Sequence, residues 1–199
     1  MRVVCNGLGK ILCGALLVVS LPPLFLYWLL IHPFVSFWRG RGIGATYSVI
    51  LMIIAAAMVG LFSIRHYLLA IDFGTSYALV ILGILCLALS ATLRFAIQKR
   101  FTIKTLSGLP EIAPDRYPRK LITDGIYSRV RHPRYVQFLV ALMGYALIAN
   151  HLASYIVVAL WLPAIHVIVL LEEKELHDHF GDVYENYCRL VPRYIPKMR

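Results

Sequence analysis

The chain has 199 residues, of which 60% are hydrophobic, and a mean hydropathy of +0.73. This composition excludes an ordinary soluble domain and predicts an integral membrane protein with several spans and one compact polar end. The net charge of +10 could indicate nucleic-acid binding. However, the basic residues are scattered through inter-helix segments without a recognition motif, so we expect contact with anionic lipid headgroups and no nucleic-acid partner.

The first 31 residues resemble a secretory signal, because basic residues precede an apolar run. No small-x-small cleavage site closes that run and further apolar runs follow, so we expect a retained first helix. The four cysteines, Cys5, Cys13, Cys86 and Cys188, show no C-x-x-C spacing. We therefore expect neither a disulfide framework nor a zinc site.

Three uncharged runs of membrane-spanning length follow one another: residues 11–31, 42–64 and 73–93. About 20 helical residues are needed to cross a hydrocarbon layer of about 30 Å, so each run predicts one transmembrane helix. Pro22 and Pro23 are expected to kink the first of them.

The long polar segment at residues 94–134 contains Pro110, Pro114 and Pro118 before the helix start at Pro133. Because proline interrupts helices, we expect an ordered loop with short helical turns. Residues 107–111 within it could form a lid, a substrate-contact loop or a plain surface turn.

Residues 135–171 contain no Asp, Glu, Lys or Arg and are too long for one crossing. Asn150 and His151 interrupt the run, which favours two antiparallel spans joined by a tight turn. Such a hairpin returns both of its ends to the same side of the membrane. The polar loop before it and the C-terminal tail after it are then expected to lie side by side.

The chain becomes polar after Leu171, and apolar side chains recur there at helical spacing. They are Leu176, Phe180, Val183, Tyr184 and Tyr187. This pattern predicts an amphipathic helix at the membrane surface, followed by an extended tail at residues 191–196.

The expected fold is therefore all-α, a polytopic membrane bundle of about five transmembrane helices. We divide it into residues 1–100, with three helices, and residues 101–199, with the loop, the hairpin and the C-terminal helix, within a single membrane domain. Seventeen of the 20 Lys and Arg residues fall in the first loop, the long loop with its flanks and the C-terminal part. This excess of Lys and Arg predicts that the side is cytoplasmic and that the N-terminus is outside. We expect a multi-pass protein in a prokaryotic cell membrane.

The segment Leu121–Tyr135 brings many polar residues to the start of the hairpin. Gly125 can adopt φ > 0 in a tight turn, and Pro133 suits the first turn of a helix, which places His132 at the helix start. Backbone N–H groups in such a first turn favour a carboxylate or phosphate of a ligand. Three arginines add positive charge: Arg129, Arg131 and Arg134. The alternative is that these arginines only mark the cytoplasmic face and that His132 is an ordinary histidine.

Five motifs lie in order along the C-terminal half: Gly125–Tyr127, Arg131–Tyr135, Leu171–Glu173, Phe180–Tyr184 and Tyr187–Pro192. Over about residues 120–197 they resemble the isoprenylcysteine carboxyl methyltransferase family. The resemblance implies that S-adenosylmethionine binds from the Gly-x-Tyr turn through the His-Pro helix start to the paired glutamates. It also implies a lipid-linked or prenylated acceptor that enters between the helices.

The resemblance implies ten cofactor-binding residues: Lys120, Leu121, Ile122, Gly125, Tyr127, His132, Pro133, Tyr135, Glu172 and Glu173. It also implies two catalytic residues, Glu172 and Arg131. Glu172 could bind the ammonium group of the cofactor, orient the nucleophile or take a proton from an ammonium acceptor, with Glu173 in a supporting part. Without the resemblance, both glutamates would be interpreted as membrane-border residues that reach into water.

One position departs from the family pattern. Isoprenylcysteine enzymes usually carry an Arg four residues before the first Glu, where this chain has Ile168, and His166 is the nearest polar residue on that helix. The loss of a bidentate carboxylate binder leaves the acceptor open. Phospholipid N-methyltransferases, a related group, have a Glu pair without that Arg.

Two other functions remain open at this stage. Membrane sterol reductases that use NADPH resemble the same C-terminal half, and a non-catalytic lipid- or protein-binding module would explain the basic loops. A metal site at His177 and His179 is not expected, because these side chains point about 200° apart on a helix.

Overall fold

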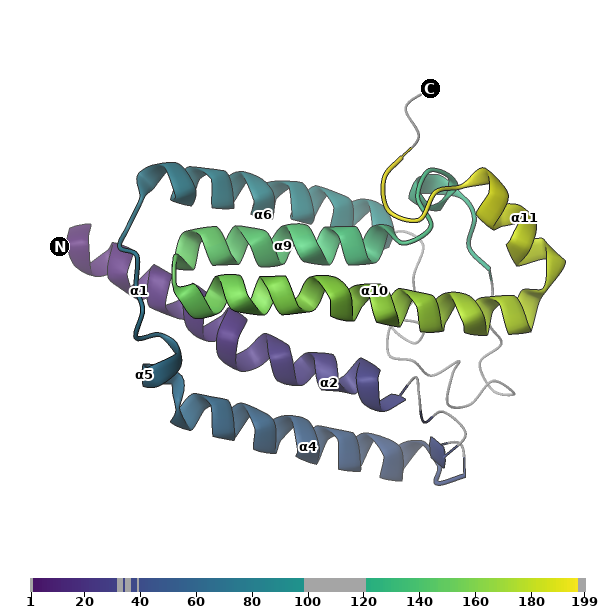
Figure 1. The fold of residues 1–199 in the computed structure, drawn as a ribbon, viewed down its shortest axis with the longest axis horizontal. Coiled ribbons are helices and arrows are strands. Elements are labelled where there is room, and N and C mark those ends of the chain that lie inside the picture. Colours follow the sequence, from purple (N-terminus) through teal and green to yellow (C-terminus); the bar gives the residue numbers. More distant parts are fainter. Residues whose placement is uncertain (1, 32–33, 35–36, 39, 99–120, 197–199) are drawn as a thin grey trace.

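The computed structural model describes residues 2–31, 34, 37–38, 40–98 and 121–196. The regular elements in this part of the chain are all helices, and the one β-bridge found there joins Asp72 to His151. The predicted all-α class is therefore confirmed for the described residues. Most of the helices run along the long axis in Figure 1. The predicted loop at 107–111 and the candidate residue Lys120 lie outside the described residues.

The N-terminal helical run has three parts: α1 (Arg2–Ala15), the π-helix η1 (Leu16–Ser20) and α2 (Leu21–Ile31). The irregular turn expected at Pro22 and Pro23 is present as the π-helix directly before them. Prolines have no N–H to donate to the preceding turn, and the N–H of Leu21 reaches back five residues to the carbonyl of Leu16. The run begins well before the predicted residue 11.

Three helices follow in the N-terminal half: α4 (Ile43–Ser63), α5 (Arg65–Leu68) and α6 (Tyr77–Gln98). The bounds of α4 agree with the prediction to within one residue. The predicted start of the next helix at residue 73 was wrong, because residues 71–73 pair with the hairpin turn instead. Phe73 donates its N–H to the carbonyl of Asn150 (3.1 Å), and Leu152 donates to the carbonyl of Ile71 (3.1 Å).

The predicted hairpin consists of α9 (Pro133–Ala149) and α10 (Leu152–Phe180). Asn150 adopts a left-handed conformation (φ 50°) that ends α9 and reverses the chain. The expectation of an amphipathic helix directly after Leu171 was wrong, because α10 continues to Phe180. No Gly or Pro interrupts residues 172–180, and the break comes only at Gly181 (φ 51°), before α11 (Asp182–Leu190).

Small residues allow α6 and α9 to pack closely. A Cβ atom added to Gly83 would lie 2.8 Å from the carbonyl oxygen of Gly144, and one added to Gly144 would lie 2.9 Å from that of Gly83. Farther along the same contact, Gln137 donates to the hydroxyl of Ser90 (2.7 Å). Close backbone approach and interhelical hydrogen bonds are typical of helix packing in membranes.

Three helices among the described residues are long and apolar enough to cross a membrane: α4, α6 and α10. Two shorter apolar helices, at Gly9–Pro23 and Pro133–Ala149, pack beside them. Large apolar side chains remain exposed along α4 and α6, as expected where lipid rather than water surrounds a helix. The chain is a membrane protein.

The main apolar core joins η1, α9 and α10. Leu17, Leu142 and Val169 are fully buried there, and Tyr135 and Ile168 belong to the same cluster. The core therefore fixes the start of α9 against the second half of α10, where the polar residues gather.

Candidate active site

The turn before α9 is built as the sequence predicts. Gly125 has φ 62° and begins a 3-10 turn, η3 (Gly125–Ser128), which buries Tyr127. The hydroxyl of Tyr187, on α11, donates to the backbone carbonyl of Tyr127 (2.6 Å). Burial raises the pKa of Tyr187 to about 12, so the hydroxyl keeps the proton that it donates. This contact ties α11 to the turn.

His132 occupies the N-cap position of α9 and Pro133 the first helical position, as predicted. The C-terminal tail lies against this helix start. The N–H groups of Arg131 and His132 donate to the carbonyls of Pro192 (2.9 Å) and Arg193 (3.1 Å). The expected proximity of the turn to the C-terminal tail is therefore present in these two contacts.

Glu173 lies at the centre of a network of polar contacts. Its Oε1 accepts hydrogen bonds from His132 Nε2 (3.0 Å) and Arg193 Nε (3.0 Å), and its Oε2 accepts one from Arg193 Nη2 (2.5 Å). Arg131 Nη2 lies 3.4 Å from Oε1. Only 12% of the Glu173 side chain is exposed. A buried carboxylate requires such partners, and these contacts engage both oxygens of Glu173 within the protein.

Glu172 has a different environment, although it is the adjacent residue. Its Oε2 accepts a hydrogen bond from the hydroxyl of Tyr135 (2.8 Å) and lies 3.8 Å from His132 Nδ1. Its side chain is 34% exposed, and Oε1 has no hydrogen-bond partner within the residues that the structure describes. Glu172 is therefore oriented by protein groups and still accessible to a cationic ligand.

Arg131 lies between the glutamates and α11. Its Nη1 donates to the Sγ of Cys188, its Nη2 faces Glu173, and 11% of its side chain is exposed. Its Nε is buried without a partner in the described part of the chain. This position suits a role in holding α11 beside the site.

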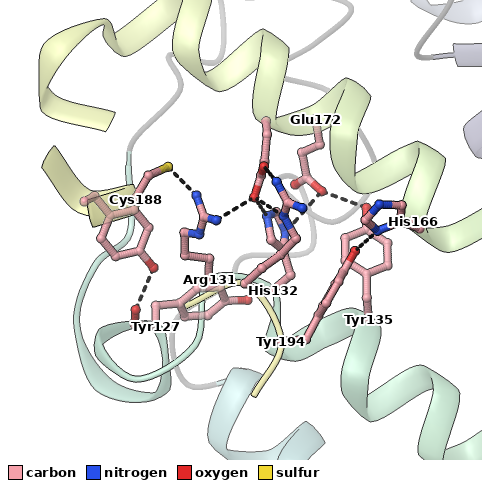
Figure 2. A network of polar contacts seen from close by, with 11 residues as sticks. Tyr127, Arg131, His132, Tyr135, His166, Glu172, Cys188 and Tyr194 are labelled. Atoms are coloured by element: carbon pink, nitrogen blue, oxygen red, sulfur yellow. Dashed lines mark hydrogen bonds and ion pairs between the residues drawn. The ribbon is translucent and has the colours of Figure 1, made fainter. Parts of the chain in front are cut away.

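Sequence reasoning missed Arg193 and Tyr194, and it named His166 only as the polar residue nearest to the absent family arginine. The hydroxyl of Tyr194 lies 3.0 Å from Nδ1 of His166, and its ring centroid lies 6.4 Å from that of His132. Figure 2 shows His166, Tyr135 and Tyr194 gathered beside Glu172. The sequence did offer one signal, because the predicted hairpin brings Arg193 in the C-terminal tail to the same end as the Glu pair. We predicted only that this tail is extended.

The remaining predicted residues lie around this centre. Leu121 packs against the apolar cluster of Tyr184 and Val191 rather than against the Glu pair, and Ile122 is half-buried. Ile168, at the position of the family arginine, is 1% exposed in the apolar core. No group of three or more potential metal ligands was found among the described residues.

Comparison with known proteins agrees with the motif resemblance. A model of the phospholipid methyltransferase family matches residues 78–183, which are 106 of the 199 residues. The matched segment runs from α6 into α11 and contains the turn, the helix start and both glutamates.

Curated relatives match over shorter segments. Protein-S-isoprenylcysteine O-methyltransferase of Schizosaccharomyces pombe is 39% identical over 77 residues, which are 38% of this chain and 33% of that protein. Methanethiol S-methyltransferase of Crocosphaera subtropica is 42% identical over 80 residues, 40% of this chain and 30% of its own. Methanethiol S-methyltransferase 1 of Bradyrhizobium diazoefficiens is 35% identical over 89 residues, which are 44% of this chain and 30% of that protein. The alignments thus cover about a third of the length of these relatives.

Proposed function

The chain belongs to the phospholipid methyltransferase family, and on this premise we propose that it is a membrane methyltransferase that transfers a methyl group from S-adenosylmethionine to a lipid-linked acceptor. The observation that carries the proposal is the pair of adjacent glutamates on α10, which contact the start of α9 through His132 and Tyr135. The carboxylate of Glu173 is paired with protein side chains, whereas that of Glu172 is held in position and remains accessible. One carboxylate, that of Glu173, neutralises the cations of the site itself. The second, that of Glu172, is then available for a cationic ligand.

The residues fit the proposed cofactor by their chemistry. S-adenosylmethionine supplies an activated methyl group on a sulfonium, and it also carries an ammonium group. We propose that the carboxylate of Glu172 binds the positive groups, with Tyr135 holding that carboxylate in place. We also propose that the turn and the helix start complete the site with Gly125, Tyr127, His132 and Pro133. Lys120, Leu121 and Ile122 remain candidates at its edge.

The chain has little covalent chemistry to perform in this reaction. Methyl transfer is an in-line displacement, so alignment and exclusion of water provide most of the acceleration. Tyr135 and His132 fix the position of Glu172, and the apolar core below them excludes water. Arg131 would act through position, since it joins Glu173 to α11.

The acceptor is proposed from the relatives and from one substitution. The relatives are named for isoprenylcysteine and for methanethiol, which suggests a small or lipid-linked group. Ile168 is buried in the core, so the bidentate carboxylate binder of the isoprenylcysteine enzymes has no equivalent at this position. An amine acceptor, as in phospholipid N-methylation, is therefore a candidate as well as a carboxylate acceptor.

We further propose that the bundle crosses the membrane five times as one membrane domain. The run α1–α2 and the helix α9 would join the three longer helices α4, α6 and α10 as spans. The basic residues favour a cytoplasmic active site and an outside N-terminus in a cell membrane.

Calorimetry on the purified protein tests cofactor binding. We expect saturable binding of S-adenosylhomocysteine, weakened by His132→Ala because that change removes contacts to both glutamates. His177→Ala, an exposed position farther along α10, is the matched control and should leave affinity unchanged. A wild-type protein that binds neither S-adenosylhomocysteine nor S-adenosylmethionine would refute the proposal. A lipid extract with radiolabelled methyl donor then identifies the acceptor.

A further inference from the structure

His166 is an ionisable side chain in the apolar part of α10. It lies six residues before Glu172, which corresponds to about 9 Å along the helix axis. Its side chain is exposed on the surface of the bundle, flanked in sequence by Ile165 and Val167. Ionisable residues at such depth are costly unless they have a partner, and they commonly mark a substrate pathway.

One ring nitrogen of His166 has a partner and the other does not. Nδ1 lies 3.0 Å from the hydroxyl oxygen of Tyr194, whereas Nε2 has no hydrogen-bond partner among the residues described. If Nδ1–H donates to Tyr194, the lone pair of Nε2 is available to accept a proton, and the imidazolium that results keeps its contact with the tyrosine oxygen.

Tyr194 is held firmly enough to orient this histidine. The tail residues before it accept hydrogen bonds from the start of α9, and Arg193 forms a bidentate pair with Glu173. The ring of Tyr194 packs against the main apolar core. The same backbone contacts that close the proposed cofactor site therefore bring His166 and Tyr194 beside Tyr135 and Glu172 (Figure 2).

We propose that His166 is the proton-accepting residue of the acceptor site and that the acceptor is a membrane-soluble thiol. The inference rests on the proposed function and deepens it. As the acceptor sulfur forms its bond to the methyl carbon, the methyl–sulfur bond of the donor breaks and its electron pair stays on the donor sulfur. The S–H proton passes to Nε2 of His166, and water later removes it. The products are a thioether, S-adenosylhomocysteine and one proton.

The surroundings of His166 favour a thiol over the other two acceptor classes. A carboxylate needs no base and would be drawn to a cation, but the nearby position 168 carries a buried isoleucine. Both a thiol and an alkylammonium must lose a proton before they attack, and the lone pair of His166 Nε2 can accept it. A neutral thiol also enters an apolar site without the cost of desolvating a charge.

The test compares three acceptors of equal chain length, dodecanethiol, dodecylamine and dodecanoate, with radiolabelled S-adenosylmethionine. The full chain is reconstituted in phosphatidylcholine vesicles. We expect methylation of the thiol, and a kcat roughly a hundred-fold lower in His166→Ala, in line with the usual contribution of a general base. The affinity for S-adenosylhomocysteine should not change. Val167→Ala, the exposed neighbour, is the matched control.

An alkyl-substituted thiophenol used as the acceptor distinguishes base catalysis from a structural role, because aromatic thiols lose their proton more readily than alkanethiols. The loss in His166→Ala should shrink with this acceptor, whereas a merely structural histidine would slow both thiols equally, and that result would overturn the proposal. Methylation of the amine or the carboxylate, but not of dodecanethiol, would overturn it too. If His166→Ala fails to bind S-adenosylhomocysteine, His166→Gln provides the same comparison. Absence of cofactor binding in the wild type would refute the proposed function instead.

Discussion

The bundle has a polar cluster at each end, and the two clusters are built differently. At the site end, where α9 begins, Glu173 meets Arg131, His132 and Arg193, and Glu172 beside it stays 34% exposed. At the turn end, where α9 stops at Ala149, Lys10 pairs with the carboxylate of Asp72. Figure 1 shows the two ends of α9 separated along the long axis of the molecule.

The turn end connects segments, and its carboxylate, Asp72, pairs with a protein cation instead of being held by a neutral hydroxyl. Asn150 donates to the carbonyl of Gly74 (2.8 Å) and accepts from the hydroxyl of Tyr155 (2.8 Å), so its amide nitrogen and its amide oxygen each have a protein partner. His151 is buried there. The difference indicates that charge alone does not identify a site. A second carboxylate, held by a neutral hydroxyl and left accessible, distinguishes the site end.

The largest expected effect is a loss of stability when the polar network at the site end is disrupted. Glu173→Ala removes the carboxylate that Arg131, His132 and Arg193 share, so we expect the free energy of unfolding to fall by about 3–5 kcal/mol. Thermal unfolding in detergent measures this loss. The neighbouring change Glu172→Ala is the control and should cost less than about 1 kcal/mol, because its carboxylate accepts one neutral hydrogen bond. Equal losses for the two variants would contradict the assigned roles.

The next effect concerns binding rather than stability. Glu172→Gln keeps the size of the side chain and removes its charge, so the affinity for S-adenosylmethionine should fall ten- to a hundred-fold, or about 1.5–3 kcal/mol. Titration calorimetry measures the change, and the melting temperature should stay near that of the wild type. Glu175→Gln, one helical turn away from residue 172 on α10, tests whether any carboxylate there has this effect.

Two other outcomes would assign Glu172 differently. A variant with normal affinity but slow turnover would make Glu172 a base, and the loss should then shrink as pH rises and the acceptor deprotonates unaided. A variant with wild-type affinity and rate would leave Glu172 as a membrane-border residue and remove it from the site.

Much of the site could be predicted from the sequence, because its signals are local. Gly125 at a tight turn and Pro133 at a helix start are conformational preferences of single residues, and both are found where expected. The hairpin at residues 135–171 followed from the length of an uncharged run and an Asn-His interruption. The family resemblance, which the family model confirms, supplied the candidate roles.

The parts that could not be predicted depend on contacts between distant segments. The sequence did not show that Arg193 returns to Glu173, so Glu173 received a supporting part although it has the most charged partners. It did not show that residues 71–73 pair with the hairpin turn, which delays the start of α6 to Tyr77. The end of α10 was placed at the polarity change after Leu171, whereas backbone conformation at Gly181 decides it.

The smallest expected effect lies at the turn end. Asp72 accepts hydrogen bonds from Lys10 and from the N–H of Gly74 (2.8 Å). Its side chain is 45% exposed, so the ion pair is partly screened and Asp72→Asn should cost up to about 1 kcal/mol, or about 2–4 °C in Tm. The affinity for S-adenosylhomocysteine should not change. A loss of binding in this variant would show that the two ends are coupled and would weaken the comparison.

Acid provides the decisive control for this last prediction. Burial alone would raise the pKa of Asp72, but the hydrogen bonds from Lys10 and Gly74 outweigh it and hold the pKa below its ordinary value of 3.8. A carboxyl group with a lowered pKa in the folded state stabilises the protein fully above its unfolded pKa, and this stabilisation is lost as pH falls through the folded value. The difference in Tm between the wild type and Asp72→Asn should therefore be present in full above the ordinary pKa of 3.8 and disappear as pH falls through the lower pKa of the folded state. A difference in Tm for Asp72→Asn that persists in acid would mean that the asparagine disturbs the loop rather than removing an ion pair.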